Sequence, residues 1–470
     1  MVVAISGFVL PKFFITQYGS TINGSISTIS QITGFLGILE AGMGSVASVA
    51  FYRSLSGNSE YDFTMVRNTV RRYYRFIAII SVSICAVVSL VLPFVLKNGE
   101  SFIFNFELAL IVSCGYFVQY YMGITSQLLL AADYKSYINS FTQIIAVVLN
   151  LALSILLIQN GTDVRIVKLA SAIVMLIRPI ILFFYVKTKY RFSNDKSFNN
   201  NLMKQRWNNF GQSVAYYVHT QTDMVVILLF LAVAENSVYA VYMSVVTAIK
   251  TVITVIISNY NPIIGRACAN KETTKDELAR AFWKFTKINN FLVNVFFSVT
   301  AVLIIPFMSI YSRGFDYDYI RPELAICLCV SEYIYLFRTP YNTLINVNGH
   351  FKETQVSAFI EAGLNIVLSI ILVNIMGVVG VVIATAVAML YRTVYCILYV
   401  KKHLLDISLL EFLKTVFSTI IMTICVVTIC LFIDLSYVNT YFRFIVAGCA
   451  FTLIFAVIQF TTNLLSLKRK

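Results

Sequence analysis

Residues 349–402 read GHFKETQVSAFIEAGLNIVLSIILVNIMGVVGVVIATAVAMLYRTVYCILYVKK. Two apolar runs of roughly 22 residues flank a short break at 376–380, and each is long enough to cross about 30 Å of hydrocarbon. Three polar residues, Glu361, Asn365 and Arg392, lie inside these runs. Hydrocarbon excludes such groups, so we expect them to face a protein interior or a water-filled cavity. The stretch therefore predicts a helical hairpin in a membrane.

The composition of the whole chain agrees with this prediction. Of the 470 residues, 59% are hydrophobic and only 12% are charged, whereas a soluble protein keeps about 25% charged residues. Apolar runs recur throughout, and the alternating segments of about 10 residues that form membrane barrels are absent. We predict an all-α polytopic membrane protein with about 14 transmembrane helices.

The basic residues are distributed unevenly between the loops. The formal net charge is +14, and most Lys and Arg residues fall in alternate loops, including 187–206 and the chain end at 468–470. The positive-inside rule then places both termini in the cytoplasm and makes the lipid bilayer, not nucleic acid, the partner of the basic residues. The nine cysteines lack disulfide or metal-site spacing, so we expect no metal and no cofactor.

The hairpin has an earlier copy at 133–187, roughly 215 positions before it. Matching residues follow in the same order along both copies and their flanks: Arg53, Arg67 and Arg71 with Arg266, Arg280 and Lys284; Tyr116 and Lys135 with Tyr333 and Lys352; Asn150 and Ser154 with Asn365 and Ser369; Arg178 with Arg392. This order predicts two parallel six-helix lobes, 1–186 and 207–402, a cytoplasmic linker at 187–206, and two additional transmembrane helices in 403–470. Two lobes inserted in one direction suit alternating access, which favours a transporter over a channel.

Four basic residues fall inside apolar runs: Arg178, Lys250, Arg338 and Arg392. Lys250 lies near mid-membrane, too deep for its stem to reach a surface. The three arginines lie roughly 12 Å from the cytoplasmic ends of their runs, so snorkelling stays open for them, most of all for Arg338 beside the helix-breaking Pro340. Guanidinium groups bind phosphate oxygens in pairs. A phosphate-bearing, lipid-linked substrate would suit these cations.

A polar stripe marks the run that begins at Trp207. Gln212, Tyr216, His219 and Asp223 follow at i, i+4, i+7 and i+11 and so share one helix face. We expect this face to line a wet cavity, with a polar seam between two helices as the alternative. Asp223 is the best candidate for ion coupling, and His219 is either its proton partner or a hydrogen-bonded lining residue.

Two further acids complete the ion-coupling candidates, Glu40 and Glu361. Glu40 sits in the glycine-rich segment GFLGILEAGMGS (34–45), where Gly34, Gly37 and their neighbours allow close helix approach. A structural partner for a buried arginine is the alternative role of Glu40. Glu332 is another acid inside an apolar run.

Motifs of the familiar enzyme classes are absent. The sequence has no phosphate-binding loop, nucleophile elbow or HExxH motif. Asp316 and Asp318 in GFDYDYIRP imitate the acidic pair of metal-dependent glycosyltransferases, but a solvated loop explains them better. The outward loops are too short to form a catalytic domain. We predict that the chain is not an enzyme.

Several motifs together resemble the Wzx-type polysaccharide flippases of the multidrug/oligosaccharidyl-lipid/polysaccharide exporter superfamily. They span almost the whole chain: Tyr18-Gly-Ser-x-x-Asn23-Gly, Gln31, Leu39-Glu40-Ala-Gly42-x-Gly44, Trp207-x-x-Phe210, Thr222-Asp223, Val238-Tyr239-x-x-Tyr242, Arg338-x-Pro340, Asn348-Gly-His-Phe-Lys352, Glu361 and Asn365. The resemblance implies two helical lobes around a central cationic cavity. It implies alternating-access transfer of undecaprenyl-diphosphate-linked oligosaccharide across the cytoplasmic membrane, coupled to an ion gradient. Family members usually have several more residues before the first span, so this span is expected to be incomplete.

These observations lead to a flippase hypothesis for surface polysaccharide (capsule or O-antigen-like) synthesis, with other polysaccharide-assembly membrane proteins as possible partners. Lys250 and Arg338 would hold the diphosphate with help from Arg178 and Arg392, while Tyr216 and Gln212 would line the cavity. Asp223, Glu40, Glu361 and His219 are the ion-coupling candidates. One alternative is a cation-coupled multidrug exporter of the same superfamily, and another is a scaffold that transports nothing.

Overall fold

The structure, a computed structural model, describes residues 2–40, 43–55, 62–96, 98–193, 197–199, 207–258, 260–269, 274–406 and 409–467. These ranges contain helices and connecting loops and no strand. The predicted all-α fold class is therefore confirmed.

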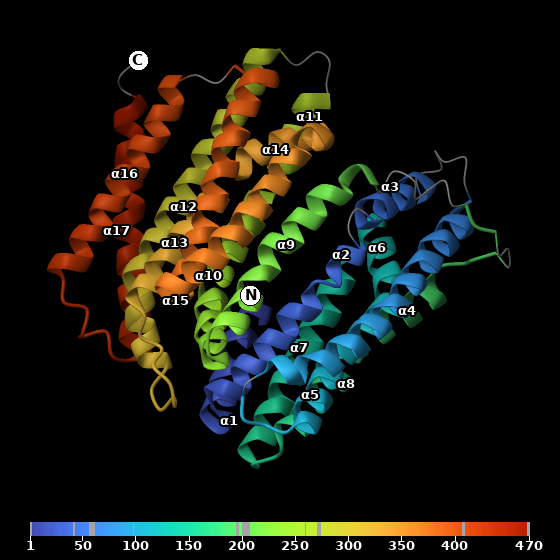
Figure 1. The fold of residues 1–470 in the computed structure, drawn as a ribbon. Coiled ribbons are helices and arrows are strands. Elements are labelled where there is room, and N and C mark those ends of the chain that lie inside the picture. The colour runs from blue at the N-terminus through green and yellow to red at the C-terminus, as the bar shows by residue number, and fades with distance from the viewer. Residues whose placement is uncertain are drawn as a thin grey trace. The chain divides into compact units, whose positions relative to one another are not determined.

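The helices divide between two compact units, Met1–Ala240 (the N-terminal unit) and Val241–Lys470 (the C-terminal unit). Figure 1 labels them in chain order. The N-terminal unit contains α1 (Val2–Gly34), α2 (Gly37–Glu40), α3 (Met43–Leu55), α4 (Phe63–Val95), α5 (Phe102–Val118), the π-helical turn η1 (Gln119–Gly123), α6 (Ile124–Ala132), α7 (Ser136–Gln159), α8 (Val164–Lys189) and α9 (Trp207–Phe230). The C-terminal unit contains α11 (Asn261–Ala269), α12 (Lys275–Tyr311), α13 (Pro322–Phe337), α14 (Thr339–Val347), α15 (Phe351–His403), α16 (Leu409–Phe432) and α17 (Tyr441–Leu467). α10 (Val233–Ser258) begins in the first unit and ends in the second.

Nine helices within the described ranges are long and apolar enough to cross a membrane. The chain is thus a multi-pass membrane protein, and the count of about 14 spans stays a prediction. One of the nine, α15, is 53 residues long and contains two predicted spans. Its Gly377 has φ 59° and ψ −140°, which separates two helical halves. A positive φ favours glycine, so the break predicted at 376–380 is confirmed.

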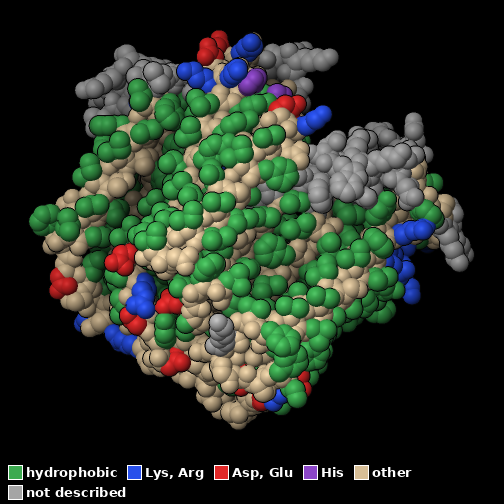
Figure 2. All heavy atoms as spheres, in the orientation of Figure 1, with side chains coloured by type: hydrophobic (Ala, Val, Ile, Leu, Met, Phe, Trp, Pro, Cys, Tyr) green, Lys and Arg blue, Asp and Glu red, His purple; other side chains and the backbone are tan. Residues whose placement is uncertain are grey.

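The long helices turn apolar side chains outward and small or polar ones inward. On α4, Phe76, Val87 and Phe94 are exposed, whereas Ser81 and Ser89 are fully buried. Lipid is as apolar as leucine, so helix association in a membrane depends on close packing of small and polar groups. Figure 2 shows hydrophobic side chains over most of the face drawn, with charged side chains gathered toward helix ends.

The apolar stretch 22–52 is not one helix. α1 ends at Gly34, and α2 and α3 follow as separate helices. Two glycines here allow close packing, because a Cβ on Gly34 would lie 2.8 Å from the Gln221 side chain, and one on Gly37 would lie 2.2 Å from Tyr217 of α9. The close helix approach predicted for the glycine-rich segment is therefore confirmed at these two positions.

The lobes predicted from the repeat and the observed units divide at different places. The repeat places a linker at 187–206, whereas the units divide at Ala240, within α10. α9 packs against α1 and is therefore grouped with the N-terminal unit. Packing and repeat ancestry are different properties, so the limits 1–186, 187–206, 207–402 and 403–470 stay predictions.

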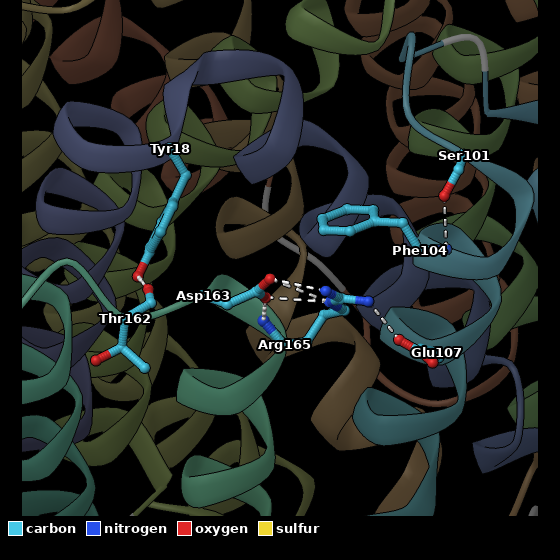
Figure 3. Close-up of polar contacts among 7 residues, drawn as sticks. All are labelled: Tyr18, Ser101, Phe104, Glu107, Thr162, Asp163 and Arg165. Carbon is cyan, nitrogen blue, oxygen red and sulfur yellow. Dashed lines mark hydrogen bonds and ion pairs between the residues drawn. The ribbon is translucent and has the colours of Figure 1, made fainter.

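A polar cluster ties three helices together at one end of the N-terminal unit (Figure 3). Arg165 of α8 contacts two carboxylates, at 2.6 Å from Glu107 of α5 and 2.8 Å from Asp163. Asp163 also caps α8 by accepting a hydrogen bond from the backbone N–H of Arg165. Tyr18 of α1 donates to the carbonyl of Thr162 in the same loop. Arg165 is therefore paired with two carboxylates.

Candidate functional site

The C-terminal unit contains a continuous chain of five charged side chains and one aromatic ring, which we call the charge network: Lys250, Glu332, Tyr335, Arg338, Glu361 and Arg392. Three members of the network come from α13 and its C-terminal end. Glu332, Tyr335 and Arg338 follow at intervals of three residues and so lie near one helix face. Arg338 itself lies between α13 and α14. Pro340 has no amide hydrogen, and the helix is interrupted two residues before it, at Arg338.

Lys250 of α10 begins the network. Its Nζ lies 2.8 Å from Oε2 of Glu332. The same Nζ lies 3.8 Å from the centre of the Tyr335 ring, a distance at which the face of an aromatic ring attracts a cation. The guanidinium of Arg338 also lies over the Tyr335 ring, with its Cζ 5.2 Å from the ring centre. Tyr335 therefore connects the two residues predicted to hold the diphosphate.

Glu361 of α15 is shared by two arginines. Arg338 Nη1 donates to its Oε1 at 2.8 Å, and Arg392 Nε lies 3.8 Å from its Oε2. Arg392 Nη1 also donates to the carbonyl of Thr354 at 2.7 Å and to the hydroxyl of Ser357. These interior partners favour burial over snorkelling for Arg338 and Arg392.

The network carries an excess of positive charge, because two carboxylates face three cations. A buried charge is tolerated only when it is paired and hydrogen-bonded. The side chains of Glu332, Arg338, Glu361 and Arg392 are 6–9% exposed, whereas that of Lys250 is 22% exposed. Lys250 is thus the cation of the network that an incoming anion reaches most easily.

A polar pair next to the network joins the two halves of α15. Asn365 is fully buried, and its Nδ2 donates to Thr385 Oγ1 at 2.7 Å. Glu361, Asn365 and Arg392 are all buried in the C-terminal unit. The expectation that the polar residues of this hairpin face a protein interior is therefore confirmed.

The remaining described candidates belong to the N-terminal unit and have separate partners. Asp223 is buried in α9 and accepts a hydrogen bond from Tyr239 Oη at 2.8 Å. Glu40 accepts one from Tyr74 at 3.2 Å. The guanidinium of Arg178 donates to Asn139 Oδ1 at 2.9 and 3.2 Å.

The other three candidates on the predicted polar stripe are Gln212, Tyr216 and His219. They belong to α9, but their side chains lie outside those that the structure describes. Their roles, and the choice between a wet cavity and a polar seam, stay predictions.

Two members of the network were missed as site residues by sequence reasoning. Glu332 was recognised as an intramembrane acid but not as the partner of Lys250, which is 82 positions earlier. Tyr335 gave no signal of its own, although its spacing between Glu332 and Arg338 places it on their face of α13. A search for aromatic residues between charges at helical spacing would have found it.

A scan of the sequence against models of known protein families found no match, and a search of curated proteins found none either. Solved structures, in contrast, share the fold. The chain is similar to the lipid II flippase MurJ in an inward closed conformation, with a TM-score of 0.73, 17% identity, and coverage of 98% of this chain and 97% of that chain.

Two multidrug transporters are also similar. The MATE multidrug transporter DinF-BH gives a TM-score of 0.66 at 15% identity, covering 86% of this chain and 92% of that chain. An inward-facing multidrug resistance MATE family transporter of the MOP superfamily gives 0.64 at 13% identity, covering 86% and 94%. The chain thus has the fold of these transporters.

Proposed function

We propose that this chain is a transporter of the MOP superfamily that moves a lipid-linked, phosphate-bearing oligosaccharide across the cytoplasmic membrane by alternating access. The substrate in this proposal is an undecaprenyl-diphosphate-linked repeat unit for a surface polysaccharide such as capsule or O-antigen. Both termini would lie in the cytoplasm, as the positive-inside rule predicts.

The observation that carries the proposal is the position of Lys250 at the accessible edge of a network with excess positive charge. A diphosphate would meet Lys250 first and compete with Glu332 for it. The guanidinium of Arg338 would supply further donors while Glu361 holds it in place. Similarity to a solved lipid II flippase over 98% of this chain supports the same substrate class.

The carboxylates offer a means of coupling to an ion gradient. Glu361 is the first coupling candidate, because its carboxylate contacts both Arg338 and Arg392. Ion binding and substrate binding would favour each other in such coupling, since coupling between two sites is reciprocal. Asp223, hydrogen-bonded by Tyr239, is the second coupling candidate, followed by Glu40.

Export of organic cations is the competing function, and the similarity to two MATE multidrug transporters favours it. The buried acids Glu332, Glu361 and Asp223 would serve such a substrate. Against it, two of these acids are paired with cations in the charge network.

Complementation separates the two functions. Expression of the chain in a strain that lacks its own repeat-unit flippase is expected to restore surface polysaccharide, and Lys250→Ala is expected to abolish the restoration. Lys352→Ala, which removes an exposed lysine of the same unit, is the matched control. A gain of resistance to cationic drugs without restored polysaccharide would overturn the flippase proposal.

A further inference from the structure

The first turns of α4 carry four arginines, which we call the arginine cluster: Arg67, Arg71, Arg72 and Arg75. Three of them, Arg67, Arg71 and Arg75, follow at intervals of four and project from one helix face. Like charges at this spacing destabilise a helix. The described ion pairs of the N-terminal unit involve Lys135 and Arg165 instead. Within the described residues, the cluster therefore has no carboxylate partner.

The cluster borders a cavity between α4, α6 and α8. Arg67 and Arg71 line it on one side, with Tyr121, Thr125 and Phe183 among the residues opposite. The enclosed space is small, about 10 Å³, and it opens to solvent, so a ligand would bind at its mouth. Arg75 lies beside it, with its Cζ 4.6 Å from the centre of the Tyr121 ring.

Aromatic rings hold the guanidinium groups in place. Arg67 Cζ lies 3.9 Å from the centre of Phe192, and Arg72 Cζ lies 3.9 Å from that of Phe198. The segment after α8 supplies both rings, and it is attached to α4 where the backbone N–H of Ser193 donates to Thr64 Oγ1 at 3.1 Å. A guanidinium stacked by its face keeps its N–H edge available for a ligand.

Two buried polar atoms beside the cavity have no partner among the described residues. They are Nε of Arg75 and Oγ1 of Thr125. Buried donors of this kind are nearly always hydrogen-bonded in folded proteins. Arg67, Arg71 and Thr125 line the cavity, so several donors border it while the described residues supply no carboxylate there.

We propose that this cavity binds a phosphoryl group, presented either by the headgroup of an anionic membrane lipid or by a soluble phosphate. Guanidinium forks match the oxygens of a phosphoryl group in charge and geometry, and Thr125 would donate one more hydrogen bond. Leu129, Phe183 and Val186 also line the cavity, and their apolar surface suits the part of a lipid next to its phosphate. The site lies within the N-terminal unit and is separate from the charge network.

Thermal unfolding of the full chain in lipid nanodiscs tests the site, because a ligand that binds the folded state raises the unfolding midpoint. Phosphatidic acid in a phosphatidylcholine background is the lipid probe, and inorganic phosphate over phosphatidylcholine alone is the soluble probe. The wild-type midpoint is expected to rise with phosphatidic acid. Arg67→Gln with Arg71→Gln is expected to weaken the apparent affinity at least about tenfold, the effect of losing a charged hydrogen bond.

The matched control is Arg280→Gln with Lys284→Gln, the repeat-related pair on α12, which removes the same charge from exposed positions. This control is expected to keep the wild-type response. An equal loss of the ligand-induced rise in unfolding midpoint in both double variants would contradict the proposed site. No loss in the first double variant would contradict it as well. If inorganic phosphate raises the unfolding midpoint and only the first double variant loses this rise, the site is supported and its ligand is a soluble phosphate.

A milder variant covers the case in which the double substitution does not fold. Thr125→Val removes only the unpartnered hydroxyl at nearly constant volume. The variant is expected to fold in phosphatidylcholine with a midpoint at or above that of the wild type, and to respond less to the phosphoryl probe. An unchanged response of this variant, together with an unchanged response of Arg75→Lys, would contradict the proposal.

Discussion

Cations are accommodated differently in the two units of this molecule. In Val241–Lys470, Arg338 and Arg392 lie in the interior and share the carboxylate of Glu361. In Met1–Ala240, the arginine cluster stays at one end of α4 and contacts aromatic rings. The repeat register aligns Glu361 with Ala146, which is fully buried, and Arg338 with Tyr121.

This alignment accounts for the lack of an interior arginine–glutamate pair at the corresponding described positions of the N-terminal unit. Ala146 offers no carboxylate, so an arginine at the position of Tyr121 would lack the partner that a buried charge requires. Tyr121 instead lies beneath the guanidinium of Arg75. In the predicted repeat, the polar groups at these aligned positions therefore differ between the two copies. We infer that substrate-related chemistry belongs to the positions where the copies differ.

The largest effect is expected for Glu361→Gln. The substitution leaves Arg338 and Arg392 buried without a carboxylate, and breaking a buried ion pair in this way costs about 3–5 kcal/mol. The unfolding midpoint of the purified protein measures the loss. Glu353→Gln, at an exposed position in the first turn of the same helix, is expected to change little.

A double variant sharpens this prediction. Replacing Glu361 and Arg338 together by Met removes both charges and fills similar volume, so it is expected to be less destabilising than Glu361→Gln. A double variant that is more destabilised than the single one would show that the ion pair is not the source of the effect.

An intermediate effect is expected at the repeat-related arginines. Arg392→Met removes the hydrogen bonds to Thr354 and Ser357 and is expected to cost about 1.5–3 kcal/mol. Arg178→Met removes only the contact of a half-buried side chain with Asn139 and is expected to cost about 1 kcal/mol or less. Equal losses of unfolding free energy would contradict the contrast between the units.

The effects at neutral polar contacts are expected to be smaller than that of Arg392→Met. Thr385→Val leaves the buried amide of Asn365 without its acceptor and is expected to cost about 1–2 kcal/mol. Ser171→Ala removes the 3.0 Å contact with Ser154 in the N-terminal unit. Ser154 keeps Asn150 as a partner, so the loss should be smaller. Unfolding midpoints of the two variants, compared in the same lipid, measure this order.

The sequence was sufficient to predict the residues that must face an interior, because a charge in an apolar run is costly anywhere else. Lys250, Arg338, Glu361 and Arg392 were identified in this way. Their pairing was not predictable, since the partners come from different helices and helical spacing relates only residues of one helix. Glu332 and Tyr335 show the same limit: they become functional candidates only when α10 packs near α13.

The predictions made from glycine residues were partly correct. The break at Gly377 was predicted from a short interruption of the apolar run and was found. The glycines at 34–45 predicted close packing but not the end of α1 at Gly34. The close approach of these glycines to Gln221 and Tyr217 of α9 is a tertiary contact. The sequence pattern of a single helix cannot predict it.

Exchange of the charges at Lys250 and Glu332 tests the central claim, that Lys250 receives the anionic substrate. Each single variant, Lys250→Glu or Glu332→Lys, is expected to lower the unfolding midpoint and to abolish polysaccharide restoration. The double variant re-forms the ion pair with the cation moved to position 332, where the native side chain is only 8% exposed. We predict that the double variant recovers the unfolding midpoint but not polysaccharide restoration. Recovery of both would mean that the pair is structural and would contradict the account.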